Sequence, residues 1–295
     1  MITMYRYKIY GLIIESEVKL YKLSETEEKD KDVLIRYGEM DETIREDVNN
    51  GMLSKMNGNS VWFRNDIGCF LIKNGNEIIV ENYEGATEED IASFILGWSI
   101  SFLFMQRGIS AIHCSALEMG GKAVLVAGYS GAGKSTITLS LLKKGYKYLA
   151  DDIAMVDIEN DFLIQPGFPQ QKVCRNVAES MKGEDLFYIN EQKDKFAYNN
   201  TEDFCDKPQK LAAMFILDAY DGDEVIFREL KGLEKWNKVI SNLFLNDAYA
   251  IFGMTGVERK RCLDIAGNTN MYMIRRPKDK DTVEEICNKI IKTVE

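Results

Sequence analysis

Short apolar and polar stretches alternate along the first 85 residues of the chain, as in YRYKIYGLII and GCFLIK. Alternation with a period of two is typical of strands that bury one face. Turn-forming runs such as NGN and KNGN separate these stretches. Residues 1–85 are therefore predicted to form a small, largely antiparallel β-rich unit, and residues 86–295 a second domain.

A long apolar run at residues 91–105, IASFILGWSISFLFM, predicts a buried helix. Thr87 is a candidate N-cap, and the acids after it suit the positive end of the helix dipole. Gly108 is a typical stop signal. The run is shorter than the roughly 20 residues that a membrane-spanning helix needs, so no membrane partner is expected.

Two strands, AIHCSALEM and KAVLVAG, are predicted next, joined as a hairpin by Gly120 and Gly121. A Gly-rich loop, a helix from Ser135 to about Lys144 and the strand YKYLA follow. Farther along, FILDAY and EVIFREL are expected to pair as a hairpin around DGD. NEQKDKFAYNNTED is expected to be an exposed loop, and residues 234–244 and 281–294 to form amphipathic helices.

Composition narrows the class of protein. The 295 residues are 45% hydrophobic and carry a formal net charge of -10. This charge repels nucleic acid and anionic lipid, so neither is an expected partner. The first residues do not have the pattern of a secretory leader, and the six cysteines are scattered without a C-x-x-C pair. A cytoplasmic protein with reduced thiols is predicted.

The segment Gly128–Ser135 reads GYSGAGKS and fits the pattern G-x-x-x-x-G-K-[ST], the P-loop. A predicted strand precedes it and a predicted helix follows it, which is the context the motif requires. An ordinary Gly-rich turn is the alternative. The residues expected to hold the nucleotide phosphates are Gly128, Ser130, Gly131, Ala132, Gly133, Lys134, Ser135 and Thr136. Lys134 supplies charge to the outer phosphates, and the Ser135 hydroxyl is a candidate Mg²⁺ ligand.

An acid pair, Asp151 and Asp152, follows the next strand. A strand, loop, helix and strand make a right-handed crossover, so YKYLA is predicted to run parallel to AVLVA. Both strands then end at one edge of the sheet, where ligands bind in such sheets. One acid is expected to hold Mg²⁺ and the other to accept the proton of an attacking hydroxyl. Asp151 is assigned to the metal and Asp152 to the base, with the reverse assignment left open.

Residues 110–156 resemble the catalytic domain of the HPr kinase/phosphorylases, which share a P-loop architecture with the phosphoenolpyruvate carboxykinases. The resemblance rests on the histidine of AIHCSAL, the loop, KGY and the acid pair. It implies an α/β fold with some α+β character, in which a mixed sheet forms the kinase core. It also places His113, the only histidine in the chain, near the reacting phosphate. A packed strand histidine is the alternative.

One departure concerns the region beyond the acids, which lacks the E-x-R-G-x-G signature of HPr kinases and reads QPGFPQQKVCR. It is closer to the P-x-x-K feature of stand-alone HPr-kinase-like proteins, with Pro169 and Lys172 at the matching positions. Lys195 is the first candidate for a cation on the transferring phosphoryl group, followed by Lys172 and Arg175. Solvated surface charges are the alternative for each.

The sequence thus predicts an ATP- and Mg²⁺-dependent kinase that phosphorylates a hydroxyl of a protein, a peptide or a small molecule. A nucleotide-binding module without phosphoryl transfer is the alternative. A carboxykinase is disfavoured, because that chemistry uses additional His and Lys metal ligands. The sequence leaves both the acceptor and the oligomeric state open, including a homo-oligomer.

Overall fold

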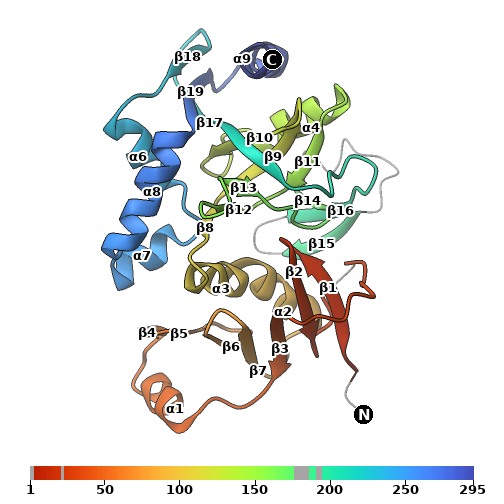
Figure 1. Cartoon of the computed structure of the whole chain (residues 1–295), viewed down its shortest axis with the longest axis vertical. Helices are drawn as coiled ribbons and strands as arrows, with labels where there is room; N and C mark the ends of the chain where they lie inside the picture. The colour runs from red at the N-terminus through yellow and green to blue at the C-terminus, as the bar shows by residue number, and fades with distance from the viewer. Residues whose placement is uncertain (1–2, 21–22, 176–185, 191–194) are drawn as a thin grey trace. The chain divides into compact units, whose positions relative to one another are not determined.

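The computed structural model describes residues 3–20, 23–175, 186–190 and 195–295, with the backbone alone at 173–174, 186–190 and 195 (Figure 1). The chain divides into two compact units. The first comprises residues 1–109 and 247–253, and the second residues 110–246 and 254–295.

The first unit is built on a seven-stranded sheet of order β1-β2-β3-β7-β6-β5-β4. Its strands are β1 (Tyr5–Ile9), β2 (Leu12–Ser16), β3 (Val33–Tyr37), β4 (Ser54–Asn57), β5 (Ser60–Arg64), β6 (Gly68–Lys73) and β7 (Glu77–Asn82). The β2–β3 and β3–β7 pairs are parallel and the other pairs antiparallel. The expected β-rich unit is therefore present, with a mixed sheet.

The helices of the first unit are α1 (Glu42–Asn49), α2 (Glu88–Phe94), the π-helical turn η1 (Ile95–Ser99), α3 (Ile100–Gln106) and α7 (Asn246–Phe252). The helical segment begins as predicted, because Thr87 forms a capping box with Asp90. It ends at Gln106, before Gly108 at φ 80°.

The division between the units falls at 109/110 and not at the predicted 85/86, because the helical segment packs on the first sheet. The ring of Phe94 lies 5.8 Å from that of Phe70 on β6. At the other end of the segment, the Gln106 amide bonds the Ile72 carbonyl and the Gly75 N–H. An apolar helix is assigned to a domain by the sheet that it covers, and the sequence does not show which sheet that is.

The second unit contains a nine-stranded mixed sheet, whose path β11-β9-β10-β17-β13-β12-β8 is extended by β19 on β17 and β18 on β19. The strands are β8 (Ser110–Ile112), β9 (Cys114–Met119), β10 (Lys122–Gly128), β11 (Lys147–Ala150), β12 (Ala154–Asp157), β13 (Leu163–Ile164), β17 (Gln209–Tyr220), β18 (Ile226–Glu229) and β19 (Asn270–Pro277). The predicted α/β class with a mixed sheet is confirmed.

A separate three-stranded sheet of order β14-β16-β15 also belongs to the second unit, with β14 (Gln170–Cys174), β15 (Leu186–Asn190) and β16 (Lys195–Asn199). The helices are α4 (Lys134–Lys143), α6 (Leu233–Ser241), α8 (Gly256–Asn268) and α9 (Val283–Val294). Figure 1 shows α6 and α8 side by side, and the two are in contact. None of the helices in the described ranges is long and apolar enough to cross a membrane.

Strands β10, β17 and β19 run parallel, so their carboxyl ends meet at one edge of the sheet. The predicted hairpin of β9 and β10 forms around Gly120 and Gly121. Strand β11 pairs with β9, antiparallel, and therefore runs in the same direction as β10, with β9 between them. Gly128 and Asp151 consequently leave the sheet at the same edge.

Two sequence predictions about pairing were wrong. FILDAY and EVIFREL do not form a hairpin, because β19 lies between β17 and β18 and pairs with both. Residues 195–199, expected in an exposed loop, form the central strand β16 of the small sheet. Ala197 and Tyr198 are buried there. In both cases the partner is distant in sequence, and local composition does not reveal it.

The core of the second unit lies between the nine-stranded sheet and helices α4 and α9. Phe215 of β17 is fully buried in it, and its ring stacks on that of Tyr272 with centroids 5.1 Å apart.

Replacing Phe215 with Ala removes this stack and leaves a cavity, which is expected to lower the free energy of unfolding by about 3–5 kcal/mol. Ile226→Ala, on the edge strand β18 with 39% of the residue exposed, is the matched control and should cost less than about 1 kcal/mol. Urea unfolding of both variants measures the difference. Equal losses would contradict this placement of the core.

Candidate functional site

The Gly128–Ser135 loop joins the end of β10 to the start of α4 and requires glycine at defined positions. Gly128, Gly131 and Gly133 have φ angles of 140°, 86° and 107°, a region that side-chain-bearing residues rarely adopt. A Cβ at Gly128 would also lie 2.5 Å from the Leu217 carbonyl of the neighbouring strand. The three glycines of the motif therefore fit the conformation that the sequence predicted.

Two cations bind the carbonyl groups of this loop. Lys134 Nζ donates to the Gly128 carbonyl at 2.7 Å and lies 3.4 Å from that of Tyr129. Arg276, from the end of β19, donates through Nε to the Ala132 carbonyl at 2.9 Å and through a terminal nitrogen to the Gly131 carbonyl at 3.3 Å. In a trans peptide the N–H points away from the C=O. Fixing a carbonyl therefore also fixes the direction of the next N–H.

The remaining loop residues differ in exposure. Ser130 and Thr136 are exposed, Ala132 is fully buried, and Ser135 is half-buried on the first turn of α4. The Tyr129 hydroxyl accepts a hydrogen bond from the Ala219 N–H at the end of β17. The loop is thus tied to both β17 and β19.

Asp151 is the first residue after β11, and both of its carboxylate oxygens accept hydrogen bonds. The Ser115 hydroxyl donates to Oδ1 at 2.6 Å, and the Lys172 backbone N–H donates to Oδ2 at 2.7 Å. Burial raises the pKa of Asp151 above its ordinary value, although these two hydrogen bonds oppose the rise.

Asp152 adopts a positive φ of 69°, which is uncommon for residues other than glycine. Its Oδ2 accepts from Lys172 Nζ at 2.9 Å, and its Oδ1 lies 3.6 Å from His113 Nδ1. Burial by itself would lower the pKa of the Lys172 ammonium, but the Asp152 carboxylate outweighs that effect and the pKa is raised. Lys172 therefore stays charged at neutral pH.

His113 lies at the bend between β8 and β9, with fully buried neighbours Ile112 and Cys114. Its backbone N–H donates to the Asn242 carbonyl at 2.7 Å, and its side chain is 31% exposed. The break in the strand at His113 brings the ring to the acid pair.

The main chain of Lys172 joins the loop helix to the acid pair. Its N–H binds Asp151, and its carbonyl accepts from Ser135 Oγ at 3.4 Å. Lys172 is the third residue of β14, and Pro169 precedes that strand with its carbonyl bound to the Asn200 N–H. Ser135, Asp151 and Asp152 therefore all contact Lys172, and His113 lies beside Asp152.

The sequence also proposed Arg175 and Lys195 as candidate cations. Arg175 is exposed, and its guanidinium lies 5.6 Å from the centroid of the Phe196 ring. Lys195 begins β16, and its side chain lies outside the described part of the structure.

Sequence reasoning missed Ser115 and Arg276. Ser115 lies two residues beyond His113, on a strand predicted for this edge, so its proximity could have been inferred from topology. Arg276 is more than 140 residues from the loop, and no local signal links the two.

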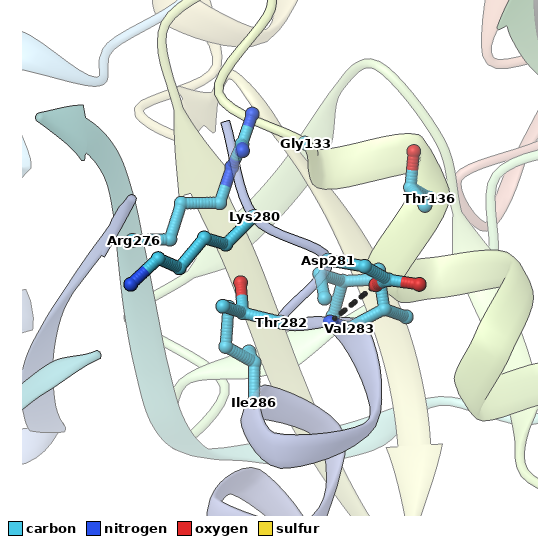
Figure 2. Close-up of a pocket in the computed structure, with 9 residues that line it drawn as sticks. Gly133, Thr136, Arg276, Lys280, Asp281, Thr282, Val283 and Ile286 are labelled. Carbon is cyan, nitrogen blue, oxygen red and sulfur yellow. Dashed lines mark hydrogen bonds between the residues drawn. The ribbon is translucent and has the colours of Figure 1, made fainter. Parts of the chain in front are cut away.

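A cavity of about 120 Å³ lies beside the start of α4, next to Gly133 (Figure 2). It is lined by Gly133, Thr136, Ile137, Arg276, Lys280, Asp281, Thr282, Val283 and Ile286. Figure 2 shows the segment from Lys280 to Ile286 facing Thr136 on α4, with the Val283 N–H bound to the Asp281 carboxylate. The cavity thus has an apolar floor with charged groups at its rim.

The raised pKa of Asp151 predicts a dependence of stability on pH. The folded protein holds the Asp151 proton to a higher pH than the unfolded chain does. Between the ordinary value of 3.8 and the raised pKa, the stability contributed by this carboxyl therefore falls as the pH rises. Relative to wild type, Asp151→Asn should accordingly be more stable at pH 7 than at pH 4.

Urea unfolding in the presence of a chelator measures this difference, and the exposed Asp206→Asn variant is the control. A difference between Asp151→Asn and wild type that is the same at pH 4 and pH 7 would contradict the inferred burial of the charge.

Comparison with known proteins gives similarity over part of the chain. No known family profile matches it. The HPr kinase/phosphorylase of Lactobacillus gasseri is 33% identical over 93 residues, which are 28% of this chain and 29% of the relative. That of Enterococcus faecalis is 31% identical over 124 residues, 39% of each chain. The chain thus spans between 29% and 39% of the length of these relatives.

The structure of the Hpr(Ser) kinase/phosphatase from Coxiella burnetii aligns with a TM-score of 0.32 and 12% identity, over 62% of this chain and 90% of that one. This score is too low to support an argument about the site. The curated relatives alone bear on the resemblance that the loop and the acid pair predicted, and they confirm it. Over the matched part, this chain is similar to HPr kinase/phosphorylases.

Proposed function

We propose that the protein is a kinase that uses a nucleoside triphosphate, most simply ATP, with Mg²⁺ to phosphorylate a hydroxyl group. One observation carries the proposal: Ser135 on the loop helix and Asp151 on the acid pair bind the same residue, Lys172, through its carbonyl and its N–H. The acids thus lie beside the loop, as phosphoryl transfer requires.

The loop fits a polyphosphate. The side chain of Arg276 binds the Ala132 carbonyl, so the opposite edge of that peptide directs the Gly133 N–H away from Arg276 at the start of α4. The side chain of Lys134 binds the Gly128 carbonyl, which sets the direction of the Tyr129 N–H in the same way. Backbone N–H groups at a helix N-terminus bind phosphate oxygens favourably. The Lys134 ammonium, which is bound to loop carbonyls here, would move to bind the outer phosphates.

The Ser135 hydroxyl and the Asp151 carboxylate fit Mg²⁺, because hard oxygen donors are the ligands it prefers. Both groups would exchange their contacts with the Lys172 main chain for contacts with the metal. Bound Mg·ATP would supply the phosphoryl group and the cation that neutralises its oxygens.

Asp152 is the proposed base, because Asp151 is the acid that shares Lys172 with Ser135. The Asp152 carboxylate would accept the hydroxyl proton as the acceptor oxygen attacks phosphorus. Lys172 Nζ, at 2.9 Å from this carboxylate, would then be available to the transferring phosphoryl group, and His113 would donate a hydrogen bond to it. Lys172 therefore replaces Lys195 as the first candidate for this role.

The acceptor is proposed to be a serine of a protein or peptide, or a small hydroxylated molecule. The matched relatives are named for the protein HPr, which makes HPr the first protein to test. The net charge of -10 favours neutral or basic acceptors through long-range steering. A kinase of this kind would act in the cytoplasm, where ATP and Mg²⁺ are available.

A second function, a nucleotide-binding module that regulates without transferring phosphate, is favoured by a different observation. Asp152 is held in an ion pair with Lys172, and a carboxylate engaged in this way abstracts a proton less readily. Such a module would keep the loop and the metal ligands and need no base.

Asp152→Asn separates the two functions. For a kinase, the variant should bind Mg·ATP within a few-fold of wild type and transfer phosphate roughly 10²–10⁴ times more slowly, the usual contribution of a general base. Transfer from γ-labelled ATP is measured with free serine, HPr and serine-terminated peptides as acceptors. Asp157→Asn, at the end of β12, is the control. Tight nucleotide binding with no transfer by wild type to any acceptor would establish the binding module instead.

A further inference from the structure

Arg276 is the penultimate residue of β19, and its side chain contacts the phosphate loop at the edge of the sheet. Its guanidinium uses all three of its nitrogens. Nε donates to the Ala132 carbonyl at 2.9 Å, one terminal nitrogen to the Gly131 carbonyl at 3.3 Å and the other to the Pro277 carbonyl at 3.2 Å. We call the first two contacts the Arg276 brace.

The brace fixes the orientation of two consecutive peptide groups of the loop. With the Ala132 carbonyl directed at Arg276, the N–H of Gly133 must point to the opposite side. The Gly131 carbonyl is held in the same way, and the N–H of Ala132 on the other side of that peptide donates to the Tyr129 carbonyl at 3.1 Å. The peptide group between Gly131 and Ala132 is therefore held by hydrogen bonds at both its C=O and its N–H.

Gly133 is the residue that the brace needs at this position. A Cβ built on Gly133 would lie 3.3 Å from Arg276 Nε, closer than side-chain carbons normally approach. The residue also has a φ of 107°. Glycine therefore serves two purposes here: it allows the left-handed backbone, and it leaves space for the guanidinium. Figure 2 shows Arg276 directed at the loop beside Gly133.

A lysine could replace Arg276 only in part. The guanidinium presents several donors in a fixed planar fork, whereas an ammonium is a single point charge on a flexible stem. Two carbonyls of adjacent peptides are held in one geometry only by such a fork.

We propose that Arg276 is a positioning residue that sets the phosphate loop in its binding conformation through its carbonyls, without contacting the phosphates. The effect on nucleotide binding rests on the proposed function, whereas the effect on the loop does not. A Gly-rich segment has little intrinsic preference for one conformation. Arg276 supplies the hydrogen bonds that select one.

The neighbouring residue provides a matched control. Arg275 lies on the same strand, and its Nε donates to Asp218 at 3.2 Å while its guanidinium lies 4.5 Å from the centroid of the Tyr220 ring. Arg275→Gln removes the same charge from the same strand and leaves the loop carbonyls bound.

The first experiment measures hydrogen exchange of the loop amides without nucleotide in wild type, Arg276→Gln, Arg276→Lys and Arg275→Gln. Exchange of the Ala132 amide, which donates to the Tyr129 carbonyl, is expected to accelerate on the order of tenfold to a hundredfold in Arg276→Gln, as loss of hydrogen bonds from a charged donor predicts. Arg276→Lys should restore part of the protection, and Arg275→Gln should match wild type at the loop. Amides of β17 report on the general stability of the sheet.

Unchanged loop exchange in Arg276→Gln would overturn the proposal, and so would acceleration spread equally over the loop and β17, which indicates a purely structural role. This arm needs no nucleotide. The exchange result can therefore be interpreted even if wild type binds no Mg·ATP. Absence of Mg·ATP binding would instead overturn the proposed function.

The second experiment measures the affinity for Mg·ATP as a function of salt. A positioning residue lowers the affinity and leaves its salt dependence unchanged, whereas a residue in contact with phosphate makes the dependence shallower, because screening acts on the lost charge pair. Lys134→Ala is the reference for loss of a direct charge. A salt dependence for Arg276→Gln as shallow as that of Lys134→Ala would show that Arg276 contacts the phosphates, contrary to the proposal.

Discussion

The half-buried carboxylate of Asp151 is the constraint on which the rest of the site depends. A carboxylate removed from water destabilises the fold unless donors meet its oxygens. Ser115 supplies one donor from β9, and the Lys172 N–H supplies the other from β14. Satisfying this one group therefore fixes β14 against the end of β11. The same requirement brings the Lys172 carbonyl to Ser135 on the loop helix.

The second feature of the site is the use of cations against carbonyl oxygens. A Gly-rich loop exposes polar backbone groups that no regular structure pairs. Here Lys134 and Arg276 bind loop carbonyls from opposite ends of the motif, one from α4 and the other from β19. The loop is therefore held before any ligand arrives, and the entropic cost of ordering it is met by folding and not by binding.

Several parts of this arrangement could be predicted from the sequence. The alternation in residues 1–85, the capped helix after Thr87 and the strand–loop–helix around Gly128 depend on contacts close in the chain. The position of Asp151 beside the loop follows from the handedness of a single crossover. The hairpin expected around DGD failed for the opposite reason, because β19 arrives from about 50 residues later and separates β17 from β18. Residues 195–199 likewise become a strand only because β14 and β15 flank them.

The sequence alone therefore determined the chemistry of the site: a glycine-rich turn, a lysine, a serine and two adjacent acids, all delivered by one strand–helix–strand unit. Their spacing is short, so local geometry specifies them. The tertiary structure decided which groups these residues meet. Lys172 became the link between loop and acids, and Arg276 the support of the loop, because strands far apart in the chain end at the same edge of one sheet. These contacts depend on the pairing of strands that are distant in the chain. The local composition of each strand does not encode its partner.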